Sequence, residues 1–264
     1  MRTFPSDFIW GTATSSYQIE GGWNADGKGP SIWDAFTQIP GRIHEGETGN
    51  EACDHYHRFR EDVQLMKQLG VNAYRFSIAW SRILPDGTTE SINQAGIQFY
   101  SDLIDELLAN GIQPWVTLYH WDLPLALEMQ KDGWLNPQIA DAFADYAAVC
   151  FEHFGDRVKN WITLNEPWVV AVLGYGQGVF APGRTSNSEP YLAAHHQILA
   201  HAKAVDVYRR QFKTQQAGQI GMSNNCDWRE PLTDTPTDRE AAERALEFFV
   251  SWFADPVYLG RYPQ

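Results

Sequence analysis

The stretch FREDVQLMKQLGVNAYRFSIAW, residues 59–80, contains the pattern that decides the fold. Its first half places Val63, Met66 and Leu69 at helical spacing. The helix is expected to end at Gly70, because a C-terminal cap needs a residue in the left-handed conformation. The second half is apolar, aromatic and short, which is typical of a buried strand. A helix is therefore followed at once by a strand.

The same unit recurs along the chain. Further helices are predicted over residues 97–111, 139–155, 191–212 and 243–264, and further strands over 112–121, 158–167 and 219–225. The stretch DFIWGTATSSYQ, residues 7–18, predicts one more strand ahead of all of these. Five strands that alternate with long helical segments are typical of βαβ units, which build a parallel sheet with right-handed connections.

Composition and charge narrow the class of protein. The chain has 264 residues, of which 44% are hydrophobic and 20% charged, which is enough for one large core or two ordinary globular domains. Because the helix–strand unit repeats without a domain boundary, we expect a single domain over residues 1–264. Its formal charge of −13 argues against binding to nucleic acids or to anionic membranes. No apolar run approaches the roughly 20 residues that a membrane span needs, and the N-terminus lacks the pattern of a secretory signal. We therefore expect a cytoplasmic protein.

Cysteine and histidine spacing gives little support for a metal. Cys53, Cys150 and Cys226 are odd in number and widely separated, so free thiols are expected. Cys53 and His57 have the i, i+4 spacing of two ligands on a helix. Because no second ligand pair and no HExxH signature occurs, polar packing at a helix start is the favoured interpretation, with no metal site.

Each predicted strand ends in residues that are poorly suited to a core. These residues are Gln18 with Glu20, Trp80, His120 with Trp121, Asn165 with Glu166, and Asn224 with Asn225. A single polar strand end is usually just the place where a sheet meets water. In a (β/α)₈ barrel, however, the carboxyl ends of the strands form the active-site face, so the whole set is expected to converge on one cavity.

Four of these motifs carry a family resemblance. The segments FIWGTATSSYQIEGG (8–22), YRFSIAWSRI (74–83), YHWDLP (119–124) and TLNEP (163–167) resemble glycoside hydrolase family 1, the retaining β-glucosidase and β-galactosidase type. The resemblance covers the whole chain. It implies a (β/α)₈ TIM barrel that hydrolyses terminal β-glucosides or related β-glycosides by a double displacement, without a cofactor.

The resemblance also implies roles for individual residues. Glu166 matches the general acid/base, Arg75 matches the residue beside the nucleophile, and the sugar-binding positions are Gln18, His120, Trp121 and Asn165. The chemistry suits these residue types, because the leaving oxygen must be protonated as the glycosidic bond breaks. Amide and imidazole groups match sugar hydroxyls, and an indole offers an apolar face to the C–H surface of the sugar.

One part of the family pattern is absent from the sequence. A retaining enzyme needs two carboxylates about 5 to 5.5 Å apart. In the family the nucleophile is a glutamate in an ENG context on the seventh strand, and no ENG occurs here. Glu20 and Asp122 are carboxylates near the same face but do not stand at that position. We therefore expect about the first five β/α units of the barrel, with open sheet edges and a missing C-terminal segment or partner chain.

Two functions remain open on this basis. The first is a β-glycosidase that acts on a β-glucoside or oligosaccharide once the rest of the barrel is supplied. The second is a catalytically inactive barrel fragment that binds a partner chain, or a sugar without hydrolysis. A nucleotide enzyme is disfavoured because no GxGxxG or GxxxxGK sequence follows any predicted strand.

Overall fold

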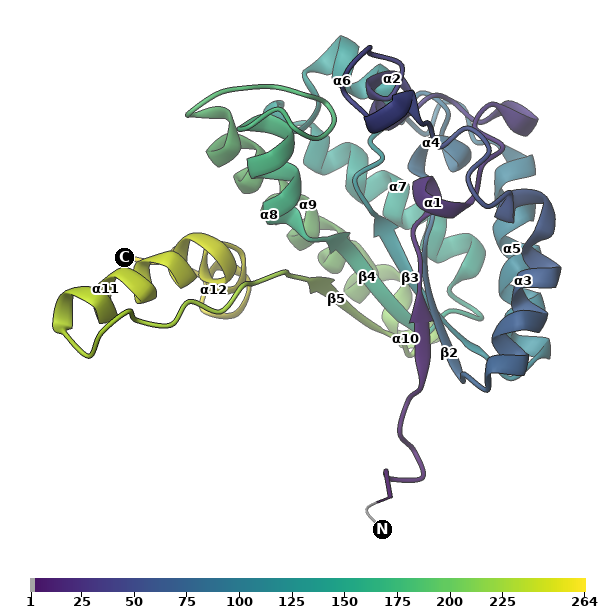
Figure 1. Ribbon diagram of the computed structural model, residues 1–264. Coiled ribbons are helices and arrows are strands. Elements are labelled where there is room, and N and C mark those ends of the chain that lie inside the picture. Colours follow the sequence, from purple (N-terminus) through teal and green to yellow (C-terminus); the bar gives the residue numbers. More distant parts are fainter. Residues whose placement is uncertain (1–2) are drawn as a thin grey trace.

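The computed structural model describes residues 3–264, and a five-stranded parallel sheet forms its centre. The strands lie side by side in chain order, each paired with the next (Figure 1). They are β1 (Gly11–Ala13), β2 (Ala73–Ser77), β3 (Gln113–Tyr119), β4 (Asn160–Asn165) and β5 (Gln219–Ser223). The predicted parallel α/β fold is confirmed. Because the strands are parallel, all their carboxyl ends lie at one edge of the sheet.

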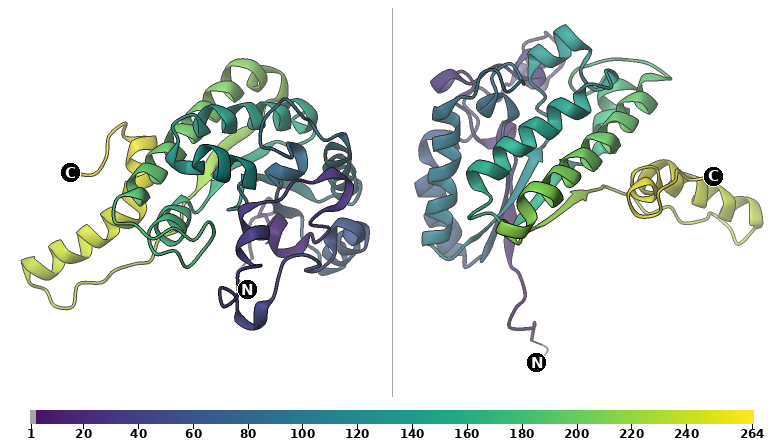
Figure 2. Two further views of the ribbon diagram at one scale, coloured as in Figure 1. Left: turned by 90° about the horizontal axis from the view of Figure 1, so that it is seen from above. Right: turned by 180° about the vertical axis from the view of Figure 1, so that it is seen from behind.

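Four long helices form a layer along the sheet, and each packs on the next (Figure 2). They are α3 (His55–Leu69), α5 (Gln94–Ala109), α7 (Ile139–Phe154) and α9 (Glu189–Val207). Helix α3 ends as predicted, since Gly70 has φ 80° and donates its N–H to the Lys67 carbonyl. Across residues 3–264, no helix combines the length and the apolar character that would let it cross a membrane.

The remaining helical segments are short. The α-helical ones are α1 (Ser16–Ile19), α2 (Ile32–Phe36), α4 (Trp80–Ile83), α6 (Leu125–Lys131), α8 (Pro167–Val169), α10 (Lys213–Gln216), α11 (Pro236–Leu246) and α12 (Trp252–Tyr258). The 3₁₀ and π segments are η1 (Ala25–Gly27), η2 (His44–Gly46), η3 (Gly133–Leu135), η4 (Val170–Gly174), η5 (Tyr208–Phe212) and η6 (Glu247–Ser251). Several of them follow strand ends, where they position the loops of the site.

The first strand is shorter than its sequence predicts. A strand was expected over residues 7–18, but β1 covers only Gly11–Ala13, and the chain turns into helix α1 at Ser16. The reason is a tertiary contact, because the Ser16 backbone N–H donates to Ser77 Oγ at 2.7 Å instead of continuing the ladder. Gln18 consequently lies on a helix beyond the strand end.

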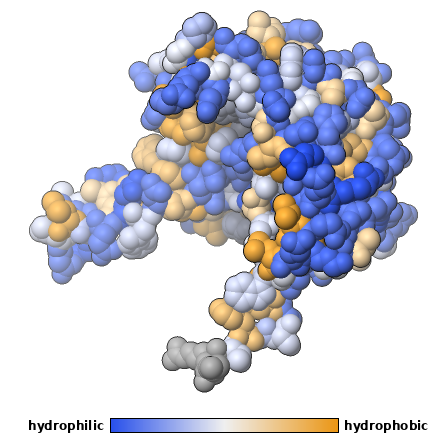
Figure 3. Space-filling view, turned by 45° about the vertical axis from the view of Figure 1, so that its right-hand side comes forward, coloured by the Kyte–Doolittle hydropathy of each residue, from blue (hydrophilic) through white to orange (hydrophobic). Residues whose placement is uncertain are grey.

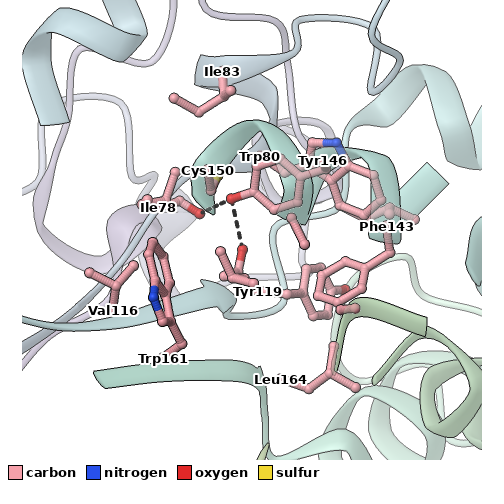
Figure 4. Close-up of a cluster of buried hydrophobic side chains, with 14 of the residues drawn as sticks. Ile78, Trp80, Ile83, Val116, Tyr119, Phe143, Tyr146, Cys150, Trp161 and Leu164 are labelled. Atoms are coloured by element: carbon pink, nitrogen blue, oxygen red, sulfur yellow. Dashed lines mark hydrogen bonds between the residues drawn. The ribbon is translucent and has the colours of Figure 1, made fainter. Parts of the chain in front are cut away.

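An aromatic cluster packs next to the ends of β2 and β3 (Figure 4). Trp80 stacks on Tyr146 of α7 with ring centroids 4.8 Å apart, and Phe143 packs against both. The Tyr146 hydroxyl donates to the carbonyls of Leu118 at 2.9 Å and Ile78 at 3.3 Å. Helix α7 is therefore tied to the chain at the ends of both β2 and β3.

The sheet has two strands that pair on one side only within residues 3–264, β1 and β5. A hollow of about 380 Å³ lies over the last three strands, lined in part by Trp115, Ile162 and Met222. Beyond β5 the chain leads into an arm, residues 224–264, that contains α11 and α12 and extends away from the sheet (Figure 1). Hydrophobic side chains are visible around the recess between this arm and the rest of the molecule (Figure 3).

Gly96 is predicted to tolerate no side chain, although it lies inside helix α5. Alanine normally stabilises a helix interior by about 1 kcal/mol relative to glycine. Here an added Cβ would lie 2.0 Å from the Arg82 carbonyl oxygen. We expect Gly96→Ala to lower the free energy of unfolding by about 1–3 kcal/mol, measured by urea denaturation. Gly221→Ala is the control, since no atom lies within 4 Å of its added Cβ, and an equal loss in both variants would contradict the steric explanation.

Candidate active site

Three polar side chains from neighbouring strands form a hydrogen-bonded row at the carboxyl edge of the sheet. Arg75 of β2 donates through Nη2 to Asn165 Oδ1 at the end of β4, and through Nε to Thr117 Oγ1 at 3.1 Å. The Asn165 amide is 3.1 Å from Nε2 of His120, which directly follows β3. Because guanidinium groups only donate, the amide oxygen must face Arg75 and the amide nitrogen must face His120. The row therefore makes His120 Nε2 an acceptor.

The tautomer and charge of His120 follow from this row. A neutral imidazole that accepts at Nε2 carries its proton on Nδ1, and this buried atom has no partner within residues 3–264. Burial, with a smaller contribution from the positive charge of Arg75, lowers the pKa of His120 to about 4. His120 is therefore uncharged at neutral pH.

The charge state of His120 can be tested by titration. We expect its imidazole ¹⁵N signals to stay those of a neutral ring from pH 8 down to about pH 5, and to change only near pH 4, because burial lowers its pKa. The measurement is NMR of the ¹⁵N-histidine-labelled chain, with the His120→Gln variant to assign the signal. A midpoint near the ordinary value of about 6.5 would show that water reaches the ring and that the ring takes up a proton as an exposed histidine does.

Trp121 holds the ends of β3 and β4 together. Its backbone has φ 76°, which is a strained conformation for a residue other than glycine. Its indole N–H donates to the Asn165 carbonyl at 2.9 Å. Its ring lies 5.6 Å from that of Phe180, measured between centroids. The strain is thus offset by contacts that fix the indole beside the polar row.

Glu166 is the first residue after β4 and is half-buried. It also has a positive φ, 48°, and its N–H donates at 2.7 Å to the carbonyl of Ser223, the last residue of β5. Pro167 follows as the first residue of α8, where its missing N–H costs nothing. Burial lowers the pKa of Arg75, and the Glu166 carboxylate opposes this shift, so the two side chains are within electrostatic range. The strand end thus presents a carboxyl group beside Arg75.

Gln18 lies on α1, which follows the carboxyl end of β1. It is exposed on α1, two residues after Ser16, whose hydroxyl donates to Asp122 at 2.5 Å. Asp122 in turn lies two residues after His120. The structure places Gln18, His120, Trp121, Asn165 and Glu166 at or just beyond the carboxyl ends of β1, β3 and β4. Arg75 lies in the middle of β2, and its side chain reaches Asn165.

Two of the predicted strand-end residues do not face the site. Trp80 is fully buried under the sheet edge in the aromatic cluster. Glu20 is 5% exposed and is bonded to Arg82 at 3.0 Å and to the Tyr100 hydroxyl at 2.5 Å. The expectation that every strand end lines one cavity is wrong for these two. Trp80 begins the short helix α4 and Glu20 directly follows α1, and both turn back into the core, which sequence periodicity does not reveal.

Other side chains support the site and were not singled out from the sequence. Thr117 accepts from Arg75, Ser77 contacts Ser16, and Phe180 packs on Trp121. A hydroxyl residue inside an otherwise apolar strand is the signal that would have identified the first two. Phe180 lies in a loop and has no such signal.

Residues 3–264 contain no candidate metal centre. Cys53 is exposed, and His57 Nδ1 is bonded to Asp54 at 2.6 Å instead of to a shared ligand. In the described part of the chain, no three His, Cys, Asp or Glu side chains are grouped in a way that would hold a metal ion.

The chain is similar in sequence to known glycoside hydrolases over its whole length. The sequence profile of glycosyl hydrolase family 1 matches residues 1–264. The chain is 57% identical to β-glucosidase 42 of Arabidopsis thaliana over 98% of its own length and 54% of that protein. It is 54% identical to the coniferin β-glucosidase of Pinus contorta, covering 54% of that protein. The chain thus spans about half the length of the curated relatives it matches.

Solved structures of β-glucosidases also match nearly all of this chain with a little more than half of their own length. The fold matches the rice Os3BGlu6 β-glucosidase with a TM-score of 0.97 and 54% identity, over 98% of this chain and 57% of that one. It matches the family 1 β-glucosidase of Thermotoga maritima with a TM-score of 0.95 and 51% identity, over 100% of this chain and 59% of that one. The five-stranded sheet is therefore part of a (β/α)₈ barrel, and the chain belongs to glycosyl hydrolase family 1.

Proposed function

We propose that this chain supplies the acid/base half of a retaining β-glycosidase that hydrolyses terminal β-D-glucosides or related β-glycosides. One observation carries the proposal: Arg75, His120 and Asn165 form a continuous hydrogen-bonded row next to Glu166, at the edge where a barrel binds its substrate. Relatives that are more than 50% identical over the aligned residues, which make up about half of their own length, are named β-glucosidases. The specific roles below follow from the chemistry of these groups.

In the first step Glu166 donates a proton to the glycosidic oxygen while the bond from that oxygen to C1 breaks. A second carboxylate attacks C1 and forms a glycosyl ester. In the second step the Glu166 carboxylate takes a proton from water, the water oxygen bonds to C1, and the ester bond breaks. Two inversions at C1 give net retention.

The neighbouring groups bind and orient the sugar. The Asn165 amide lies one residue before Glu166 and is suited to donate to the 2-hydroxyl as charge develops at C1. The neutral His120 and the exposed Gln18 offer hydrogen bonds to other hydroxyls, and the indole of Trp121 offers an apolar wall. Arg75 holds Asn165 in place and supplies a positive charge beside the expected position of the nucleophile.

The second carboxylate is proposed to come from outside these 264 residues. Asp122 and Glu20, the buried carboxylates nearest to the site in sequence, are bonded to Ser16 and to Arg82. The unpaired edges of β1 and β5 and the hollow over β3 to β5 are surfaces on which the remaining strands of a barrel would pack. We therefore propose a C-terminal barrel segment, in the same or a separate chain, as the partner.

The test is reconstitution. The 264-residue chain is assayed on a β-glucoside alone and after addition of a separately made C-terminal segment from a full-length relative, and the product anomer is followed by ¹H NMR. We expect no turnover alone, and turnover with the β anomer formed first after addition. Formation of the α anomer would contradict the assigned roles. Binding of the segment or of a sugar without hydrolysis would favour the alternative, an inactive barrel fragment.

A further inference from the structure

Three buried residues connect the ends of the first three strands, and we call them the strand-end linkage: Ser16, Ser77 and Asp122. Ser16 donates its backbone N–H to Ser77 Oγ at 2.7 Å and its hydroxyl to Asp122 Oδ2 at 2.5 Å. The Ser77 hydroxyl is 3.1 Å from the Ser16 hydroxyl and donates to it. The side chains are 3%, 1% and 2% exposed. The linkage therefore joins the end of β2 to α1 and to the loop after β3, two segments that lie beyond the paired residues of the sheet.

Asp122 is an unusual residue for a purely structural position. Its second oxygen, Oδ1, is buried and has no partner among the described residues. Burial raises the pKa of Asp122 to about 7, although the hydrogen bond from Ser16 acts in the opposite direction. A buried carboxyl with one bonded oxygen costs free energy that an apolar residue would avoid, so its presence needs an explanation.

The position of the linkage in the chain supplies that explanation. Ser16 lies two residues before Gln18, and Asp122 lies two residues after His120, with Trp121 between them. Trp121 has φ 76°, a conformation that costs about 1–3 kcal/mol outside glycine and persists only when surrounding contacts impose it. One of these contacts is its indole bond to Asn165. Within residues 3–264, the side chain of the following residue, Asp122, is hydrogen-bonded only by Ser16.

We infer that Ser16 and Asp122 are positioning residues for substrate binding: their hydrogen bond fixes the His120–Trp121 turn and helix α1, so that His120, Trp121 and Gln18 keep a common geometry. The inference rests on the proposed function for its substrate. The claim that this hydrogen bond fixes the His120–Trp121 turn can be tested on the free chain, without substrate. Neither residue touches the reacting atoms, and both act through the groups they hold.

The experiment compares three variants of the 264-residue chain. Ser16→Ala removes the donor. Asp122→Asn keeps an acceptor of the same shape for Ser16. Tyr208→Phe is a matched control, because it also removes one buried hydrogen bond, from the Gly218 N–H at 2.9 Å, at the opposite end of the sheet. The readouts are the melting temperature and the ¹⁵N signals of His120, which report whether Nε2 still accepts from Asn165.

We expect Ser16→Ala to shift the two His120 nitrogen signals toward the average of the two tautomers, and to raise its titration midpoint by about one pH unit toward its ordinary value. Asp122→Asn and Tyr208→Phe should leave the His120 signals in place. If Ser16→Ala lowers the melting temperature as Tyr208→Phe does but leaves His120 unchanged, the linkage is only structural and the inference is overturned. If Ser16→Ala does not fold, Ser77→Ala is judged by the same criterion.

A second readout uses the reconstituted enzyme. Ser16→Ala should raise KM for a β-glucoside about 10-fold, because displacements near 1 Å in a site cost up to about 100-fold, while Asp122→Asn stays within about 2-fold. An unchanged KM in Ser16→Ala would overturn the inference. Absence of any Glu166-dependent turnover would instead reject the proposed function, and the His120 signals of the free chain would still decide the linkage.

Discussion

Replacing Glu166 by glutamine is expected to lower kcat for an alkyl β-glucoside by about 100- to 10,000-fold in the reconstituted enzyme. Glutamine keeps the size and hydrogen bonding of the side chain but has no proton to give to the leaving oxygen. An alkoxide is a poor leaving group, so its departure depends on that proton. The rate is measured by release of glucose, with the isolated chain as the blank.

The choice of substrate makes this prediction specific. An aryl glucoside with an acidic phenol leaves without protonation, so its first step should be much less affected by Glu166→Gln than that of the alkyl glucoside. Glu152→Gln is the matched control, because this glutamate is exposed on α7, away from the strand ends. Equal losses on both substrates would mean that Glu166 acts in binding or folding and not as the acid.

Removing the carboxylate of Glu20 is expected to be the most destabilising single change. Arg82 is 1% exposed, and its guanidinium bonds to Glu20 at 3.0 Å and lies over the Tyr56 ring at 4.1 Å. Glu20→Ala leaves this charge buried without its partner, which costs about 3–5 kcal/mol. The free energy of unfolding from urea denaturation measures the loss.

Two further variants test whether the loss of stability comes from leaving a buried charge without its partner. Asp141→Ala breaks an exposed pair with Lys203, where we expect a loss of at most about 1 kcal/mol. The double variant Glu20→Met with Arg82→Met removes both charges and should be more stable than Glu20→Ala alone. A loss below about 1 kcal/mol in Glu20→Ala would show that water reaches Arg82 and that the pair is not buried in solution.

The sequence was sufficient for the sheet and for much of the site, because both depend on local patterns. The helical spacing that ends at Gly70 and the apolar strand after it can be recognised from neighbouring residues in the sequence. The same holds for the polar end of the strand just before Glu166. The hydrogen bond from Ser16 to Asp122 joins residues 106 positions apart, and nothing local distinguishes it from a surface contact. Trp80 and Glu20 were misplaced for the same reason, since only tertiary packing turns them into the core.

The chain order of the strands has a consequence for synthesis on the ribosome. Each strand pairs with the one made just before it, so the sheet can grow from one side as the nascent chain emerges, without waiting for a distant partner. The row from Arg75 to His120 and Asn165 is complete once β4 has emerged. Glu166 is bonded later, when Ser223 accepts its N–H. We therefore expect the sugar-binding groups to be ordered on the growing chain before the acid/base residue is.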